Sequence, residues 1–155
     1  VAITESWNGS SWTEVADLNT ATDLAGCVGA DNTSALAFGG RVPPSYTTTN
    51  KVESWNGSSW TEVNDMGLAI HNNAGSGIIT AALSVGGGSS PTNVQTWNGT
   101  NWTNVNSINT GRSLAKSAGT STATVTIGGK DGDAGAGTTE EWYAEGIVTE
   151  KISSS

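Results

Sequence analysis

The chain has 155 residues, of which 35% are hydrophobic and only 13% are charged, and its formal net charge is −8. An average soluble domain is roughly 45–50% apolar, so a chain this rich in Gly, Ser, Thr and Asn favours strands and turns over helices. Its six basic residues are dispersed, which argues against nucleic acid as a partner because phosphate binding needs a clustered positive surface. No stretch approaches the roughly twenty apolar residues of a membrane span, so no membrane insertion is expected.

The first predicted element is a segment with two tryptophans around an Asn-Gly pair, and it recurs along the chain. It spans 5–15, returns almost unchanged at 53–63, with changes at 95–105, and in degraded form around Glu140–Trp142. A fixed period of 20–50 residues is typical of solenoids and propellers. We interpret the recurring tryptophans as structural, namely Trp7, Trp12, Trp55, Trp60, Trp97, Trp102 and Trp142.

A second landmark lies between the tryptophan segments, namely a short apolar run that ends in two glycines. The pairs are Gly39-Gly40, Gly86-Gly87 and Gly128-Gly129, and each predicts a strand that ends in a tight bend. From the second Trp to the next pair the steps are 27, 26 and 26 residues, whereas from the pair to the next Trp they are 15, 10 and 13. The variation in length therefore falls in one loop.

Each Trp-Asn-Gly-x-x-Trp segment predicts a β-hairpin, because Asn-Gly supplies the positive φ angles of a type I′ turn. With Asn56-Gly57 as the turn, Trp55 faces Ser58; with Gly57-Ser58 as the turn, Trp55 faces Trp60. Both registers put the two indoles on one face. Aromatic pairs contribute roughly 0.5–1.5 kcal/mol beyond their burial, so we expect packing in preference to a ligand platform.

For the second unit the pattern predicts strands at about 24–31, 34–40, 48–56 and 59–64, a four-stranded antiparallel meander of the size of a propeller blade. A glycine pair after the second strand, an aromatic late in the third and a Trp that starts the fourth resemble kelch repeats over essentially the whole chain. Kelch usually has Tyr-Asp in place of Trp-Asn, and its Arg after the fourth strand is present only as Arg112, with Thr22 and Ile70 in the other copies.

The resemblance implies an all-β chain forming a β-propeller of kelch-like blades. We divide it into a partial blade 1–20, blades 21–65 and 66–107, and a degraded terminal blade 108–155, about three and a half blades. Closed propellers have at least four blades. We therefore expect either that these residues are the C-terminal part of a longer chain or that several copies close a ring.

The sequence contains few of the residue combinations that catalytic sites require. One histidine, His71, cannot build a multi-histidine metal site. The acid two residues before the first Trp recurs as Glu5, Glu53 and Glu140, but the third copy has Gln95. A position that tolerates an amide accepts a hydrogen bond and does not transfer a proton, so we expect these residues to tie neighbouring strands or blades together.

The variable loops on one face are the predicted partner surface. Its candidate residues are Arg41, Tyr46, Asn93, Lys130, Asp131 and Asp133. Asp131 and Asp133 alternate with glycine as calcium loops do, but a loop without metal is favoured, and no cofactor is expected. Cys27, in a glycine-rich apolar stretch, is expected to be a small buried side chain.

The predicted function is a non-catalytic propeller module for structural assembly, adhesion or receptor recognition, with a protein partner or self-assembly. Trp-Asn-Gly kelch-like arrays are familiar from bacteriophage and marine bacterial surface proteins, so the resemblance implies a virion surface or an extracellular location. The alternative is a carbohydrate-binding propeller whose exposed Trp or Tyr stack on glycans. An enzyme is the third interpretation, and its catalytic groups would lie in further blades.

Overall fold

The computed structural model describes residues 2–88, 91–132, 134–135 and 137–144. These residues form seventeen strands and no helix, so the all-β prediction is confirmed. Every strand pair is antiparallel. Within the described ranges no helix is long and apolar enough to cross a membrane.

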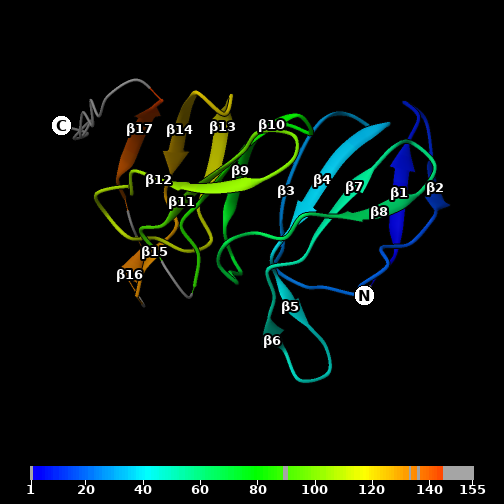
Figure 1. The fold of residues 1–155 in the computed structure, drawn as a ribbon, viewed down its shortest axis with the longest axis horizontal. Coiled ribbons are helices and arrows are strands. Elements are labelled where there is room, and N and C mark those ends of the chain that lie inside the picture. The colour runs from blue at the N-terminus through cyan, green and yellow to red at the C-terminus, as the bar shows by residue number, and fades with distance from the viewer. Residues whose placement is uncertain (1, 89–90, 133, 136, 145–155) are drawn as a thin grey trace.

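Two four-stranded sheets form the middle of the molecule (Figure 1). The first has the order β3-β4-β7-β8 and the second β9-β10-β11-β12, so each is the predicted meander. Their bounds are β3 (Gly26–Asp31), β4 (Ser34–Phe38), β7 (Val52–Trp55), β8 (Trp60–Val63), β9 (Ala74–Ile78), β10 (Ala81–Val85), β11 (Val94–Trp97) and β12 (Trp102–Val105). The four strands predicted for the second unit agree with β3, β4, β7 and β8.

Smaller sheets flank these two. A hairpin of β1 (Thr4–Trp7) and β2 (Trp12–Val15) precedes them, and a three-stranded sheet of β13 (Lys116–Gly119), β14 (Ala123–Ile127) and β17 (Thr139–Tyr143) follows. Two short hairpins occupy the variable loops, β5 (Arg41–Val42) with β6 (Thr47–Thr48) and β15 (Lys130–Asp131) with β16 (Ala134–Gly135). The predicted last hairpin, from Trp142 to Ile152, lies mostly outside the described residues.

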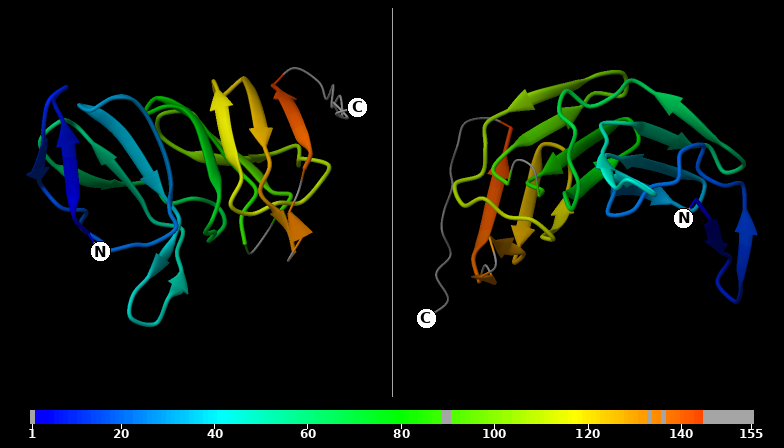
Figure 2. Two further views of the ribbon diagram at one scale, coloured as in Figure 1. Left: turned by 180° about the vertical axis from the view of Figure 1, so that it is seen from behind. Right: turned by 90° about the horizontal axis from the view of Figure 1, so that it is seen from below.

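The sheets follow one another along an arc, with β1 and β2 at one end and β17 at the other (Figure 2). The first strands of successive sheets are neighbours, because β9 contacts both β3 and β13. We call the four successive parts of the arc unit 1 (2–20), unit 2 (21–68), unit 3 (69–110) and unit 4 (111–144), each containing one tryptophan segment. Units 2 and 3 are complete sheets, and the described part of unit 1 is the single hairpin.

Backbone hydrogen bonds connect the units near the first strands. The amide of Asn72 donates to the carbonyl of Leu24, and the amide of Leu114 donates to the carbonyl of Asn72, both at 2.9 Å. Leu24, Asn72 and Leu114 all have positive φ, between 55° and 59°. This backbone conformation is uncommon outside glycine, and its recurrence at three equivalent positions shows that units 2, 3 and 4 begin with the same bend.

The glycine pairs form a second connection. Gly40 donates its amide to the carbonyl of Ile70 at 2.7 Å, and Gly87 donates to the carbonyl of Arg112 at 2.9 Å. Gly40 has φ of +98°, and a Cβ there would lie 2.6 Å from the carbonyl oxygen of Asp23. The pairs therefore do more than end a strand, since at Gly40 the missing Cβ lets the start of the same unit pass closely while the amide bonds the next unit.

The apolar core consists of two clusters, and each spans the junction between two sheets. In the first, Phe38 of β4 and Val52 of β7 meet Trp97 and Trp102 of the next unit, and the rings of Phe38 and Trp102 are 5.0 Å apart. In the second, Leu83 and other residues of unit 3 meet residues of unit 4. Adjacent sheets are thus held together by shared burial as well as by hydrogen bonds.

The tryptophan hairpins adopt the register in which the two indoles face each other. Trp55 lies opposite Trp60, with ring centroids 5.4 Å apart. Of the loop residues only Gly57 has positive φ, at +92°, and Asn56 Oδ1 accepts the amides of Ser58 and Ser59 at 3.0 Å. The prediction of a type I′ turn at Asn-Gly is wrong, because the asparagine side chain closes the loop instead, whereas the shared face of the indoles is confirmed.

Candidate interaction surfaces

Glu53 connects units 1 and 2 through a buried carboxylate. The side chain is 4% exposed. Its Oε2 accepts hydrogen bonds from the backbone amide of Asn19 at 2.8 Å and from Asn19 Nδ2 at 2.9 Å, and Oε1 accepts the amide of Thr20 at 2.8 Å. The turn that ends unit 1 is therefore bound to the third strand of unit 2.

The same connection recurs at the next two junctions. Gln95 Oε1 accepts the amide of Gly67 at 3.0 Å. Glu140 accepts the amides of Asn109 at 2.7 Å and Thr110 at 3.0 Å. The prediction that these positions accept hydrogen bonds is thus confirmed for the three later copies, each of which ties its sheet to the turn that ends the preceding unit. We call this contact the junction clamp.

Arg112 adds a buried cation to the clamp of unit 4. Its side chain is fully buried and forms an ion pair with Glu140. Its remaining N–H groups donate to the carbonyls of Thr110, Gly128 and Thr138 and to the hydroxyl of Thr138. Because all the charged groups are paired and hydrogen-bonded, this burial is tolerated, and loss of either partner would leave an uncompensated charge.

The first copy of the clamp position lies on an open face. Glu5 is exposed and accepts no hydrogen bond from the described residues. The indoles of the same hairpin are exposed too, Trp7 by 43% and Trp12 by 64%, whereas Trp55 and Trp97 are each 4% exposed. This side of the arc therefore exposes Glu5 and Trp12, the equivalents of the acceptor and the second indole of the later junctions, together with Trp7.

Cys27 corrects a prediction, because its side chain is exposed rather than buried. It lies on β3 between the buried Gly26 and Val28, on the opposite side of the strand. Gly75, the equivalent residue of the next sheet, lies so close to Val28 and Phe38 that a Cβ would come within 2.9 Å of both. The side of β3 that carries Cys27 is thus the side that a preceding unit covers elsewhere in the arc. We call Glu5, Trp7, Trp12 and Cys27 the N-terminal face.

The indole N–H groups of three tryptophans in the later hairpins donate hydrogen bonds that stabilise the sheets. Trp55 donates to the carbonyl of Asn32 at 3.0 Å and Trp97 to the carbonyl of Ile79 at 2.8 Å, both within their own sheet. Trp60 donates across the junction to Thr4 Oγ1 at 3.1 Å. In units 2 and 3 the first Trp of the hairpin thus fixes its own sheet, whereas Trp60 contacts the preceding unit.

The predicted partner surface contains one well-defined projection, the β5–β6 hairpin (Figure 1). Arg41 forms a salt bridge with Asp23 at 3.2 Å, and its guanidinium lies 5.2 Å from the ring centroid of Tyr46. Tyr46 is 53% exposed and has φ of +53°. A cation held by a carboxylate on one side can support an aromatic ring on the other, so the hairpin presents a supported tyrosine to solvent.

His71 lies beside this hairpin and is half-buried. Its Nδ1 is 3.1 Å from the hydroxyl of Thr48. Burial, and then the positive charge of Arg41, lower the pKa of His71, whereas Asp23 acts in the opposite direction. The imidazole is therefore held in its neutral form around pH 7.

The remaining candidates of the partner surface do not gather into one site. Asn93 is half-buried and donates to Asn104 Oδ1 at 3.3 Å, so it stabilises its own hairpin. The backbone of Lys130 is bonded to Ser113, and its side chain and that of Asp131 are exposed. Asp133 lies outside the described residues. Within the described ranges no three His, Cys, Asp or Glu side chains come together as a metal site would require.

The donors of the junction clamp were not predicted. Two of the three turns that carry these donors share a sequence pattern, because an apolar residue followed by Asn-Thr occurs at 18–20 and again at 108–110. No recurring sequence pattern indicated the contact between Arg41 and Tyr46. Comparison with family models finds no match for this chain, and comparison with curated proteins finds none either.

Proposed function

We propose that this chain is part of a non-catalytic β-propeller scaffold that serves structural assembly or adhesion on a virion or bacterial exterior. The repeated sheets are the blades in this proposal. The kelch resemblance supports it, as do the three clamped junctions of the arc, two of which also share apolar burial. The supported Tyr46 on the β5–β6 hairpin is the proposed contact for a protein partner.

The observation that carries the proposal is the N-terminal face. At three junctions a clamp residue binds the closing turn of the preceding unit, and Glu5 is the fourth clamp residue with no such turn. Trp60 reaches the preceding unit through Thr4, and Trp12 is the exposed equivalent of Trp60. A surface with the same acceptor and the same ring fits a further unit of the same repeat.

An extended chain tests this fit directly. In the extended chain a copy of residues 21–92 is fused directly before Ile3, and the copied cysteine is replaced by alanine. Because Thr4 corresponds to Val94 in the repeat, this fusion point keeps the native spacing between repeats. Glu5→Ala is then compared in the 155-residue chain and in the extended chain. We expect little change in the first and a loss of about 2 kcal/mol in the second, because hydrogen bonds to a charged acceptor contribute about 1.5–3 kcal/mol.

Cys27 supplies an independent readout. It is the single cysteine of the chain, so its rate of reaction with a thiol reagent reports directly on cover of the face. We expect reaction at least tenfold slower in the extended chain. Equal effects of Glu5→Ala in both chains, with unchanged Cys27 reactivity, would refute the proposal. The intact and oligomeric masses of native material then show whether the further unit comes from a longer polypeptide or from a second copy.

A further inference from the structure

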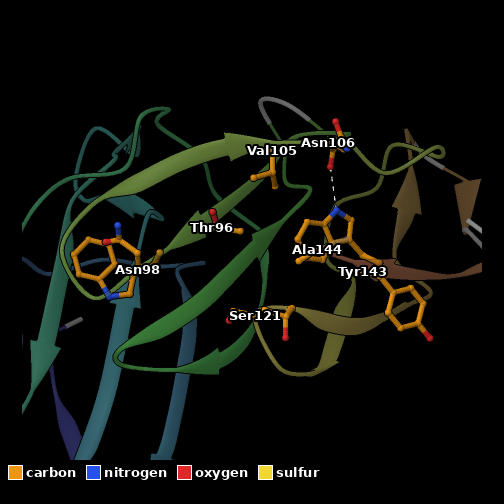
Figure 3. A pocket seen from close by; sticks show the side chains of 10 residues that line it. Thr96, Asn98, Val105, Asn106, Ser121, Tyr143 and Ala144 are labelled. Atoms are coloured by element: carbon orange, nitrogen blue, oxygen red, sulfur yellow. Dashed lines mark hydrogen bonds between the residues drawn. The ribbon is translucent and has the colours of Figure 1, made fainter. Parts of the chain in front are cut away.

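A cleft opens at the rim of the arc between units 3 and 4. Its volume is about 430 Å³, and β11, the segment after β12, the β13–β14 turn and the end of β17 line it (Figure 3). This volume is within the roughly 300–1,000 Å³ typical of ligand pockets. Trp142 of β17 forms one wall and donates its indole N–H to the carbonyl of Asn106 at 3.2 Å.

Val105 lies at the boundary between the cleft and the apolar core. It lines the cleft and packs against the apolar cluster that joins units 3 and 4. Val63, its equivalent one unit earlier, packs in the same way against the cluster that contains Trp102. The cleft is therefore continuous with the apolar junction beneath it.

The lining combines aromatic rings with uncharged polar groups. Trp142 and Tyr143 contribute accessible rings, the buried Trp97 lies beneath them, and none of the ten lining residues is charged. Tyr143 is 44% exposed. A sugar has apolar C–H faces that pack on aromatic rings and hydroxyl groups that need several hydrogen-bond partners, so a lining of this kind suits it.

Three polar groups in the lining retain hydrogen-bonding capacity toward a ligand. Among the described residues, neither the side-chain amide of Asn106 nor the hydroxyl of Ser121 has a hydrogen-bond partner. Asn98 uses its Oδ1 for the amides of Thr100 and Asn101, which leaves its Nδ2 as a donor. Figure 3 shows Asn98, Asn106 and Ser121 on different sides of the cleft, so donors and acceptors are distributed around it.

We propose that this cleft binds a neutral saccharide of one or two sugar units. The rings supply the stacking surface, and Asn98, Asn106 and Ser121 bind sugar hydroxyls. An acidic sugar is disfavoured, because the chain carries a net charge of −8 and the carboxylate of Glu141 accepts the Tyr143 hydroxyl at 3.0 Å next to the cleft. This site is separate from the N-terminal face and does not depend on assembly.

Titration with cellobiose, maltose, lactose and chitobiose, with digalacturonate as the acidic comparison, tests the proposal. The seven tryptophans give separate indole N–H signals in NMR spectra of ¹⁵N-labelled protein. We expect at least one neutral disaccharide to shift the signals of Trp97 and Trp142 while the signals of Trp7 and Trp12 stay unchanged. No shift with any neutral sugar at about 10 mM, equivalent to a binding free energy weaker than about −2.7 kcal/mol, would overturn it.

Variants then assign the binding to this cleft. Asn106→Ala removes the free amide but keeps the carbonyl that binds Trp142, and it should weaken binding about fivefold to tenfold, as loss of one hydrogen bond does. Ser121→Trp, which fills the cleft, should abolish binding. Ser10→Trp, at an exposed serine of the β1–β2 loop, is the matched control and should leave binding unchanged. Full binding by Ser121→Trp with a native spectrum elsewhere would place the sugar at another site and refute the assignment.

Discussion

Replacing Glu53 by alanine removes the best-formed junction clamp. The carboxylate is 4% exposed and accepts three hydrogen bonds of 2.8–2.9 Å from the Asn19 backbone, the Asn19 side chain and the Thr20 backbone. Each hydrogen bond to a charged group contributes about 1.5–3 kcal/mol. Asn19 is exposed, so water can replace part of what is lost. We therefore expect Glu53→Ala to lower the free energy of unfolding by about 3 kcal/mol.

Glu53→Gln separates the hydrogen bonds from the charge. The native Gln95 accepts one backbone amide at the equivalent position, so the amide variant keeps one acceptor and should lose about half as much, near 1.5 kcal/mol. Urea unfolding followed by tryptophan fluorescence measures both variants, with the slope against urea expected to stay constant. Glu62→Ala is the matched control, since Glu62 lies directly opposite Glu53 on β8 but forms an exposed ion pair with Lys51.

The explanation would be refuted if Glu53→Ala changed the free energy of unfolding by less than about 0.5 kcal/mol, the usual range of surface substitutions. It would also fail if Glu62→Ala were as damaging as Glu53→Ala. A glutamine variant as unstable as the alanine variant would show that charge, and not hydrogen-bond acceptance, holds the junction.

Two further predictions concern the glycine pairs and the histidine. In the same urea experiment, Gly40→Ala should lower the free energy of unfolding by about 2 kcal/mol more than Gly9→Ala, the size of a typical clash or strain effect. Both residues have φ near +97°, but only at Gly40 does a Cβ meet a carbonyl oxygen, at 2.6 Å. Equal losses would contradict the explanation that Gly40 is needed for close approach of the backbone. The pKa of His71 is lowered from its ordinary value of 6.5, so the unfolded chain binds this proton more readily, and stability should fall as the pH decreases below about 6.5 toward the folded-state pKa. His71→Asn should show a smaller fall in unfolding free energy between pH 7 and 5, and an unchanged slope would show that other groups cause it.

Much of the fold could be predicted because its signals are local. The Trp-Asn-Gly-x-x-Trp segments and the glycine pairs mark strand ends within a few residues of each other, and the structure places β3, β4, β7 and β8 where the pattern expects them. The presence of Gln95 among glutamates already indicated hydrogen-bond acceptance. Such features depend on the chain a short distance away, so composition and spacing are sufficient to detect them.

The errors concern neighbours that are distant in the sequence. Cys27 was expected to be buried because its surroundings are apolar, but the covering of β3 on that side depends on a preceding unit. The turn is a local exception: of the two registers left open, the structure adopts the one with Trp55 opposite Trp60, and the side chain of Asn56, not a positive φ angle at that residue, closes the loop. The contact of Arg41 with Tyr46 and the cleft beside Trp142 both arise from the packing of separate segments, for which a single sequence carries no pattern.

The junction clamp has a consequence for how such a chain can change in length. At each junction one side chain binds mainly backbone amides, so the partner turn can be Asn-Thr in one place and Gly-Leu in another. Duplication or deletion of one whole unit by recombination would bring together a clamp residue and a turn that already fit each other. The number of units can therefore vary between related genes without any compensating substitution at the new boundary.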